Sequence, residues 1–99
     1  MIYEVANIQV KVGTGPLFEQ RFSQALPLFK RARGCNSARL ERSVEHPDRY
    51  LVVIGWQTLD DHVVAFRTSN DYALWRELVG DFFAAPPIVD HTEVVVSGF

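Results

Sequence analysis

The sequence predicts an α+β domain whose strands and helices follow the order β-α-β-β-α-β. Residues 2–12 alternate between apolar and polar side chains, as a strand with one buried face does. Residues 50–56 are apolar at both parities, which indicates a strand covered on both faces. Each of these stretches is followed by apolar residues at helical spacing. A lone chain of 99 residues cannot easily cover both faces of a sheet, so we expect helices on one side and a second copy of the chain on the other.

The first half of the chain predicts a strand, a helix and a second strand. The strand runs from Ile2 to Val12 and is broken by Gly13–Pro16, where the proline suits the first turn of a helix. Pro27 removes a backbone donor, so we expect it to kink this helix or tighten its last turn, and Gly34 suits the position after the helix end. The helix is predicted from the apolar residues Phe18, Phe22, Ala25, Leu26 and Phe29.

A hairpin comes next. Its strands are predicted over Ala38–Val44 and Arg49–Gln57, and the residues between them, Glu45–Asp48, are typical of a turn. Thr58 then suits the start of a second helix, because its hydroxyl can cap the helix while Asp61, three residues on, completes a capping box.

The second helical region is expected to break once. Ser69–Asp71 has the composition of a new helix cap, and Pro86–Pro87 ends the helix. Ile88–Val96 is rich in β-branched residues and is predicted as the last strand. These elements form one ferredoxin-like domain over residues 1–99, with a four-stranded antiparallel sheet and both helices on one face. The second piece is predicted from Tyr72, Trp75, Leu78, Val79, Phe82 and Phe83.

Composition excludes several classes of protein. Hydrophobic residues make up 47% of the chain, and the net charge is −2, so a nucleic-acid backbone is an unfavourable partner. No apolar run is long enough to span a bilayer, and the first residues are typical of a strand instead of a signal peptide. The single cysteine, Cys35, cannot form an intrachain disulfide and has no reactive motif around it. We therefore expect a cytoplasmic protein.

Sequence motifs for a metal or a nucleotide are absent. His46, His62 and His91 lie on a predicted turn, a helix start and a strand, without the spacing of a metal site. No glycine-rich phosphate loop follows a strand. The sequence accordingly predicts no metal and no cofactor.

The chain resembles the antibiotic biosynthesis monooxygenase family of the dimeric α/β-barrel superfamily. The resemblance covers nearly the whole chain and is carried by LPLFKRARGC, by ERSVEHPDRYLVVIGWQTLDDHVVAFRTS and by YALWRELVGDFFAAPP. It implies a homodimer in which two sheets pack face to face into a barrel. It also implies relatives that oxygenate aromatic polyketides without metal or flavin, relatives that degrade haem, and small proteins of other roles.

The haem-degrading branch of that family is similar in one position only. Asn7 matches its asparagine, but Phe66 stands where that branch has a tryptophan and Arg76 where it has a histidine. Phe66 lacks the indole N–H, and a protonated guanidinium is a poor axial ligand. The resemblance therefore favours the oxygenase branch over haem degradation.

The leading hypothesis is a small cofactor-independent monooxygenase that acts with O2 on an electron-rich aromatic or quinol-type molecule in a dry cavity between sheet and helices. Asn7 and Trp75 would orient the substrate, and His62 would be the base. Arg76 would be the charge partner. The parity of the first strand leaves open which face Asn7 occupies, and His91 is interpreted as structural. An aromatic pocket wall is predicted from Trp56, Phe66 and Tyr72.

Two other classes of protein remain in view. One is a non-catalytic dimeric domain on the same fold that binds a small ligand or serves a stress response. Oxygen uptake separates it from the enzyme. The other is an RNA-recognition module, which shares the order of elements but needs an aromatic platform and a basic sheet face. The acidic chain and the strand YLVVIGW disfavour it.

Overall fold

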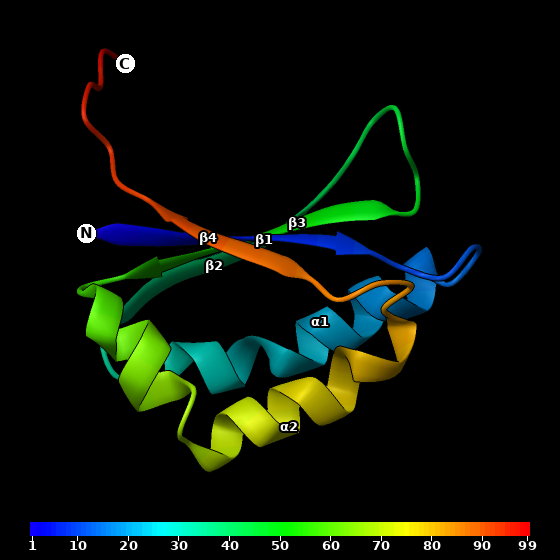
Figure 1. Ribbon diagram of the computed structural model, residues 1–99, viewed down its shortest axis with the longest axis horizontal. Coiled ribbons are helices and arrows are strands. Elements are labelled where there is room, and N and C mark those ends of the chain that lie inside the picture. The colour runs from blue at the N-terminus through cyan, green and yellow to red at the C-terminus, as the bar shows by residue number, and fades with distance from the viewer.

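The computed structural model describes all residues from Met1 to Phe99 and has the predicted order of elements. The helical layer lies entirely on one side of the sheet (Figure 1), so the ferredoxin-like α+β fold is confirmed. None of the helices is both long enough and apolar enough to span a bilayer. The elements are β1 (Ile2–Gln9), α1 (Gly15–Lys30), β2 (Cys35–Arg42), β3 (Arg49–Trp56), the π-helix η1 (Asp61–Phe66), α2 (Asn70–Val79), the 3-10 helix η2 (Gly80–Phe82) and β4 (Ile88–Thr92).

The sheet has the strand order β2-β3-β1-β4, and all neighbours are antiparallel. One row across it joins Leu40, Val52, Ala6 and Val89, and these side chains belong to the helix-facing core or pack against it. Because side chains alternate along a strand, the residues of odd number on β1 and β3 point to the other face, which no helix covers. We call this second surface the open face.

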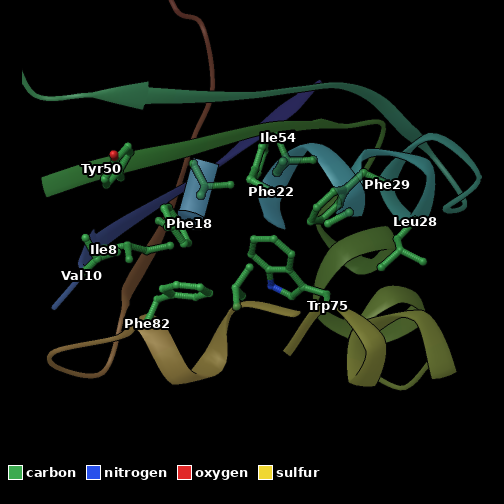
Figure 2. Close-up of a cluster of buried hydrophobic side chains, with 14 of the residues drawn as sticks. Ile8, Val10, Phe18, Phe22, Leu28, Phe29, Tyr50, Ile54, Trp75 and Phe82 are labelled. Carbon is green, nitrogen blue, oxygen red and sulfur yellow. The ribbon is translucent and has the colours of Figure 1, made fainter. Parts of the chain in front are cut away.

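Aromatic side chains fill the space between the helices and the sheet. Figure 2 shows Phe22, Phe29 and Trp75 gathered between α1, α2 and the sheet. The Trp75 ring meets those of Phe22 and Phe29 edge to face at centroid distances of 5.8 and 5.1 Å, a favourable arrangement for aromatic pairs. This region is therefore a packed core.

Helix α1 continues through Pro27 to Lys30, and its end is tightened as predicted. The N–H of Ala32 donates to the carbonyl of Phe29, three residues earlier, at 3.1 Å. Gly34 lies farther from the helix end than predicted: α1 is capped at Arg31, and Gly34, with φ +73°, belongs to the turn that leads into β2.

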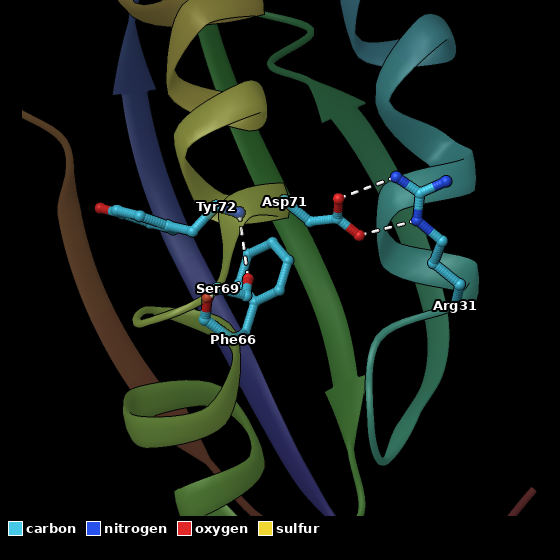
Figure 3. A network of polar contacts seen from close by, with 5 residues as sticks. All are labelled: Arg31, Phe66, Ser69, Asp71 and Tyr72. Carbon is cyan, nitrogen blue, oxygen red and sulfur yellow. Dashed lines mark hydrogen bonds and ion pairs between the residues drawn. The ribbon is translucent and has the colours of Figure 1, made fainter.

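The second helical region also follows its caps. Thr58 Oγ1 accepts from the N–H of Asp61, and the Asp61 carboxylate accepts from the N–H of Thr58, each at 3.2 Å, which is the predicted capping box. The predicted break is confirmed, because Ser69 Oγ accepts from the N–H of Tyr72 at 3.2 Å and starts α2 (Figure 3). Between the two caps the chain forms a π-helix.

Strand ends differ from the sequence prediction. β1 stops at Gln9 and β4 at Thr92, whereas strands to Val12 and Val96 were predicted. The early end of β4 follows from the register in which it pairs with β1. Thr92 lies opposite Tyr3, so β1 has almost no residues left to pair with the segment 93–99. This C-terminal segment projects away from the domain (Figure 1), and its residues Val94, Val95, Val96 and Phe99 are exposed.

Candidate functional site

A polar cluster lies inside the apolar core near one end of the sheet. Glu4 comes from β1, Trp56 ends β3, His62 belongs to η1 and His91 comes from β4. Glu4 and His91 are cross-strand partners, so both point toward the helices. The cluster is buried at its centre, with Glu4 at 9%, His62 at 3% and Trp56 at 0% exposure, and half-buried at His91. We call these four residues the Glu4–His91 cluster.

Two hydrogen bonds and one short polar contact join the cluster into a chain. His62 uses both ring nitrogens: Nδ1 lies 2.8 Å from His91 Nε2, and Nε2 lies 3.2 Å from Glu4 Oε1. The indole Nε1–H of Trp56 donates to the same Glu4 oxygen at 3.1 Å. The Trp56 and His62 rings also stack, 5.2 Å between centroids and 18° apart in plane. These contacts fix the orientation of the His62 ring.

The local backbone explains why His62 reaches the core. In η1 the N–H of Arg67 donates to the carbonyl of His62, five residues earlier, at 3.2 Å. This wider turn keeps both His62 and Phe66 buried against Trp56 while Val64 stays exposed. Short π-helical segments of this kind occur frequently at functional sites.

Burial sets the charges of the cluster. It raises the pKa of Glu4 to about 6, although the Trp56 hydrogen bond and the positive charge of Arg67 oppose the shift. Burial, helped by the charges of Arg67 and His91, lowers the pKa of His62 to about 4. The pKa of His91 is lowered as well, by burial and then by Arg67. At pH 7 Glu4 is therefore mostly ionised while both imidazoles are neutral, so the contact between Glu4 and His62 joins a carboxylate to an uncharged ring.

These protonation states determine which ring nitrogens of the cluster donate hydrogen bonds and which accept them. An ionised carboxylate repels a nitrogen lone pair, so the 3.2 Å contact with Glu4 favours the His62 tautomer whose proton is on Nε2. A neutral imidazole carries one N–H, so His62 Nδ1 accepts, and His91 Nε2 donates to it. His91 Nδ1 is then the unprotonated end of the chain. A carboxylate that orients a neutral imidazole is an arrangement suited to proton abstraction.

Three residues predicted for the site lie together. Trp56, His62 and Phe66 are in mutual contact, with ring centroids 5.2 to 6.4 Å apart. Tyr72 is half-buried and meets Phe66 edge to face at 5.8 Å. These rings therefore form a contiguous aromatic group next to the polar cluster, and their role as the wall of a substrate pocket stays a prediction.

Trp75 and Arg76 lie elsewhere. Trp75 is 9% exposed and packs against the two phenylalanines of α1, while Arg76 is exposed and its guanidinium sits 5.4 Å from the centre of the Phe83 ring. The cation that influences the buried cluster is instead Arg67, whose charge affects the pKa of Glu4, His62 and His91.

Asn7 occupies the open face and is exposed. Its neighbours Ala6 and Ile8 are buried on the helix-facing side, so alternation along β1 directs Asn7 away from the helices. The expectation that Asn7 and Trp75 border one hollow between sheet and helices is therefore corrected: they lie on opposite faces of the sheet.

Sequence reasoning missed Glu4 and His91 as members of the site. The signal for Glu4 was present, because it is the one polar residue among the apolar even positions of the first strand. A buried carboxylate needs partners, which predicts a polar cluster around it. His91 gave no such signal, because only the pairing of β1 with β4 brings it to Glu4.

Two neighbouring grooves lie on the other edge of the molecule, between α1 and β2. The first, of about 380 Å3, is lined mainly by Leu26, Pro27 and Cys35 and their neighbours. The second, of about 430 Å3, ends at Tyr50, whose hydroxyl donates to Glu19 at 2.5 Å. Both are open and shallow, and neither contains a residue of the Glu4–His91 cluster.

The fold and the cluster together define a ferredoxin-like α+β protein with a buried carboxylate–histidine chain. Residues 1–78 match the model of the antibiotic biosynthesis monooxygenase family. The match spans most of the chain, and the chain belongs to that family.

Relatives agree with this assignment. The chain is 34% identical over 95 residues to the uncharacterized Bacillus subtilis protein YczJ, covering 96% of this chain and all of YczJ. A crystal structure from Bordetella bronchiseptica, assigned to the antibiotic biosynthesis monooxygenases, is 49% identical, with a TM-score of 0.94 over 96% of this chain and 97% of that one. SnoaB, a cofactor-independent oxygenase from Streptomyces nogalater, has a TM-score of 0.82 at 16% identity over 97% and 94% of the two chains, which shows a shared fold.

Proposed function

We propose that this protein is a cofactor-independent monooxygenase that acts on an electron-rich aromatic or quinol-type small molecule. The observation that carries the proposal is the buried chain of polar contacts from Glu4 through His62 to His91, beside the aromatic group of Trp56 and Phe66. Membership of the antibiotic biosynthesis monooxygenase family supports the class of reaction, and the cofactor-independent oxygenase SnoaB shows that the fold accommodates it.

The reaction needs only a base, a dry site and O2. Removal of a proton from the phenol or enol leaves an electron-rich anion, which is the electron donor for O2. For a substrate with an activated CH2 group, one oxygen atom enters as C=O and the other leaves as water, so the four electrons that reduce O2 come from the substrate. The imidazole of His62, held neutral by burial and oriented by Glu4, belongs to the proton-accepting group.

Oxygen uptake tests the proposal directly. With a panel of anthrone-like and naphthoquinol compounds, and without metal or flavin, we expect the protein to consume O2 above the spontaneous rate. His62→Gln should lower this turnover by about 100-fold, because it interrupts the buried chain at its centre and so removes the contribution of a positioned base. His46→Ala, on the exposed hairpin, is the matched histidine control and should stay active.

Two outcomes contradict the proposal. Saturable binding of these compounds without O2 consumption would identify a ligand-binding domain instead of an enzyme. Full activity in a His62→Gln variant with a native circular dichroism spectrum would remove the cluster from the reaction.

We also propose that the protein is a homodimer joined through the open face. This face presents half-buried apolar residues, including Tyr3, Val5 and Leu51, with no layer of the chain above them. The exposed β-branched segment 94–96 adds apolar surface beyond the last strand and has no strand to pair with in its own chain. A second copy would cover both.

Sedimentation tests the dimer. At tens of micromolar we expect a mass twice the 11.3 kDa of one chain. Val5→Lys, in the middle of the open face, should give monomers because it places a charge in the buried contact. Val64→Lys, which changes an exposed position of η1 on the helical side, should leave the dimer intact. A wild-type protein that sediments at 11.3 kDa would contradict this arrangement.

A further inference from the structure

The Glu4–His91 cluster has one end that its own hydrogen bonds do not occupy. Glu4 Oε1 accepts from Trp56 and lies 3.2 Å from His62, and both nitrogens of His62 have neighbours within the cluster. His91 uses Nε2 toward His62, and its ring is half-buried at the edge strand β4, whereas His62 is 3% exposed. A substrate hydroxyl that approaches from solvent therefore meets His91 before His62.

We propose that His91 is the catalytic base of the monooxygenase, that its Nδ1 takes the proton, and that Glu4 and His62 are positioning residues behind it. This inference rests on the proposed function and names the atom that performs its first step. The substrate O–H bond breaks and an N–H bond forms at His91 Nδ1, which leaves a phenolate or enolate and an imidazolium. The electron pair of the broken bond stays on the substrate oxygen, where it becomes available for reaction with O2.

The hydrogen-bond chain explains how the imidazolium is stabilised. His91, once protonated, donates more strongly through Nε2 to His62 Nδ1, and the far side of the His62 ring lies 3.2 Å from the Glu4 carboxylate. The negative charge of Glu4 thus reaches His91 through a ring that stacking on Trp56 holds in place. Because the interior is poorly solvated, this charge acts more strongly than it would in water.

Arg67 supplies the second electrostatic part of the site. It follows η1, is exposed, and its positive charge lowers the pKa of both histidines. This keeps His91 neutral and able to accept a proton at pH 7. The same charge favours an oxyanion beside His91, so the site fits substrates with an acidic hydroxyl that becomes a phenolate or enolate. The other charged groups around His91 are Glu4 on β1 and its neighbour Asp90 on β4.

The tautomers test the proposal without any turnover. In protein labelled with 15N at histidine, long-range proton–nitrogen spectra at pH 7 should show the Nε2–H tautomer for His62 and for His91. His46 is the exposed reference, and His62→Gln and His91→Ala assign the signals. A His91 that carries its proton on Nδ1 in the folded protein would overturn the proposal, because that atom would have no lone pair to offer.

Kinetics test the role itself, with the compounds of the oxygen-uptake panel. His91→Ala should lower kcat by about 100-fold, and added imidazole should restore part of the rate by entering the space left by the ring. Glu4→Gln should lower kcat with little change in KM, and should move the base limb of the kcat profile to lower pH. Removing a nearby negative charge lowers the pKa of a histidine, which gives the sign of this shift.

The two levels of the hypothesis fail in different ways. If the wild-type protein consumes O2 and His91→Ala does so at the same rate, the proposed function stands and His91 is not the base. If the wild-type protein consumes no O2 with any compound of the panel, the proposed function fails, and the tautomers still decide whether His91 Nδ1 is the free end of the chain.

Discussion

Replacing Gly34 with alanine should destabilise the protein by about 3 kcal/mol, through two separate effects. Gly34 has φ +73°, which costs a residue with a Cβ about 1–2 kcal/mol. A Cβ at this position would also overlap the carboxylate of Asp61, which is 8% exposed and accepts from the N–H of Thr58 at 3.2 Å. Displacing that carboxylate removes the capping contact, at a cost of about 0.5–2 kcal/mol.

Two other glycines separate these effects in urea unfolding experiments. Gly13 has φ +78° but open space around it, so Gly13→Ala should show the backbone cost alone, about 1 kcal/mol. Gly80 has φ −58° and no atoms within 4 Å of an added Cβ, so Gly80→Ala should be neutral or slightly stabilising. A Gly34→Ala protein as stable as Gly13→Ala would show that Asp61 moves aside without loss.

The effect of Gly34→Ala should extend to the candidate site. Asp61 precedes His62 in the chain and holds the start of η1, and the carbonyl of Gly34 accepts from the N–H of Gln57 at 2.6 Å just after Trp56. The turn after α1 therefore contacts the end of β3, which carries Trp56, and the start of η1, which carries His62. We expect Gly34→Ala to weaken the contact between His62 and His91 as well as to lower the free energy of unfolding.

Local signals in the sequence predicted most of the fold because each is physically self-contained. The Thr58–Asp61 capping box and the serine cap depend only on neighbouring residues, and both hold in the structure. Strand ends depend on the partner strand instead. The apolar run to Val96 has strong β propensity, yet β4 ends at Thr92 where β1 runs out of residues to pair.

The site was harder to predict because its parts meet only in three dimensions. His62 and His91 are 29 residues apart, and their contact requires that β4 pair with β1 while η1 lies above them. Asn7 shows the same limit, because a strand with polar residues at both parities does not reveal which face the helices cover. Arg67 gave no local signal either, because only the fold brings its charge near the buried histidines.

Glu4→Gln should stabilise the protein relative to wild type, and the gain should grow as the pH rises from 4 to 7. In the folded wild type the pKa of Glu4 is raised from 4.5 to about 6, so the native state holds this proton more tightly than the unfolded state does. The contribution of Glu4 is then fully present below pH 4.5 and is lost as the pH rises through 6. Glutamine does not titrate and can still accept the Trp56 hydrogen bond. A shift of this size corresponds to about 2 kcal/mol.

The measurement is the difference in free energy of unfolding between Glu4→Gln and wild type, from urea titrations at pH 4, 5, 6 and 7. His62 also titrates, and because its pKa is lowered it changes the free energy of unfolding with pH in both proteins. Subtracting the wild-type value from the Glu4→Gln value removes this shared contribution. Glu41→Gln is the control, because Glu41 is an exposed carboxylate on β2 and its difference shows what removing a surface carboxylate does. A difference for Glu4→Gln that does not change with pH would mean that Glu4 ionises in the folded protein as it does in the unfolded chain. The carboxylate would then be too well solvated to act on His62 as the proton chain requires.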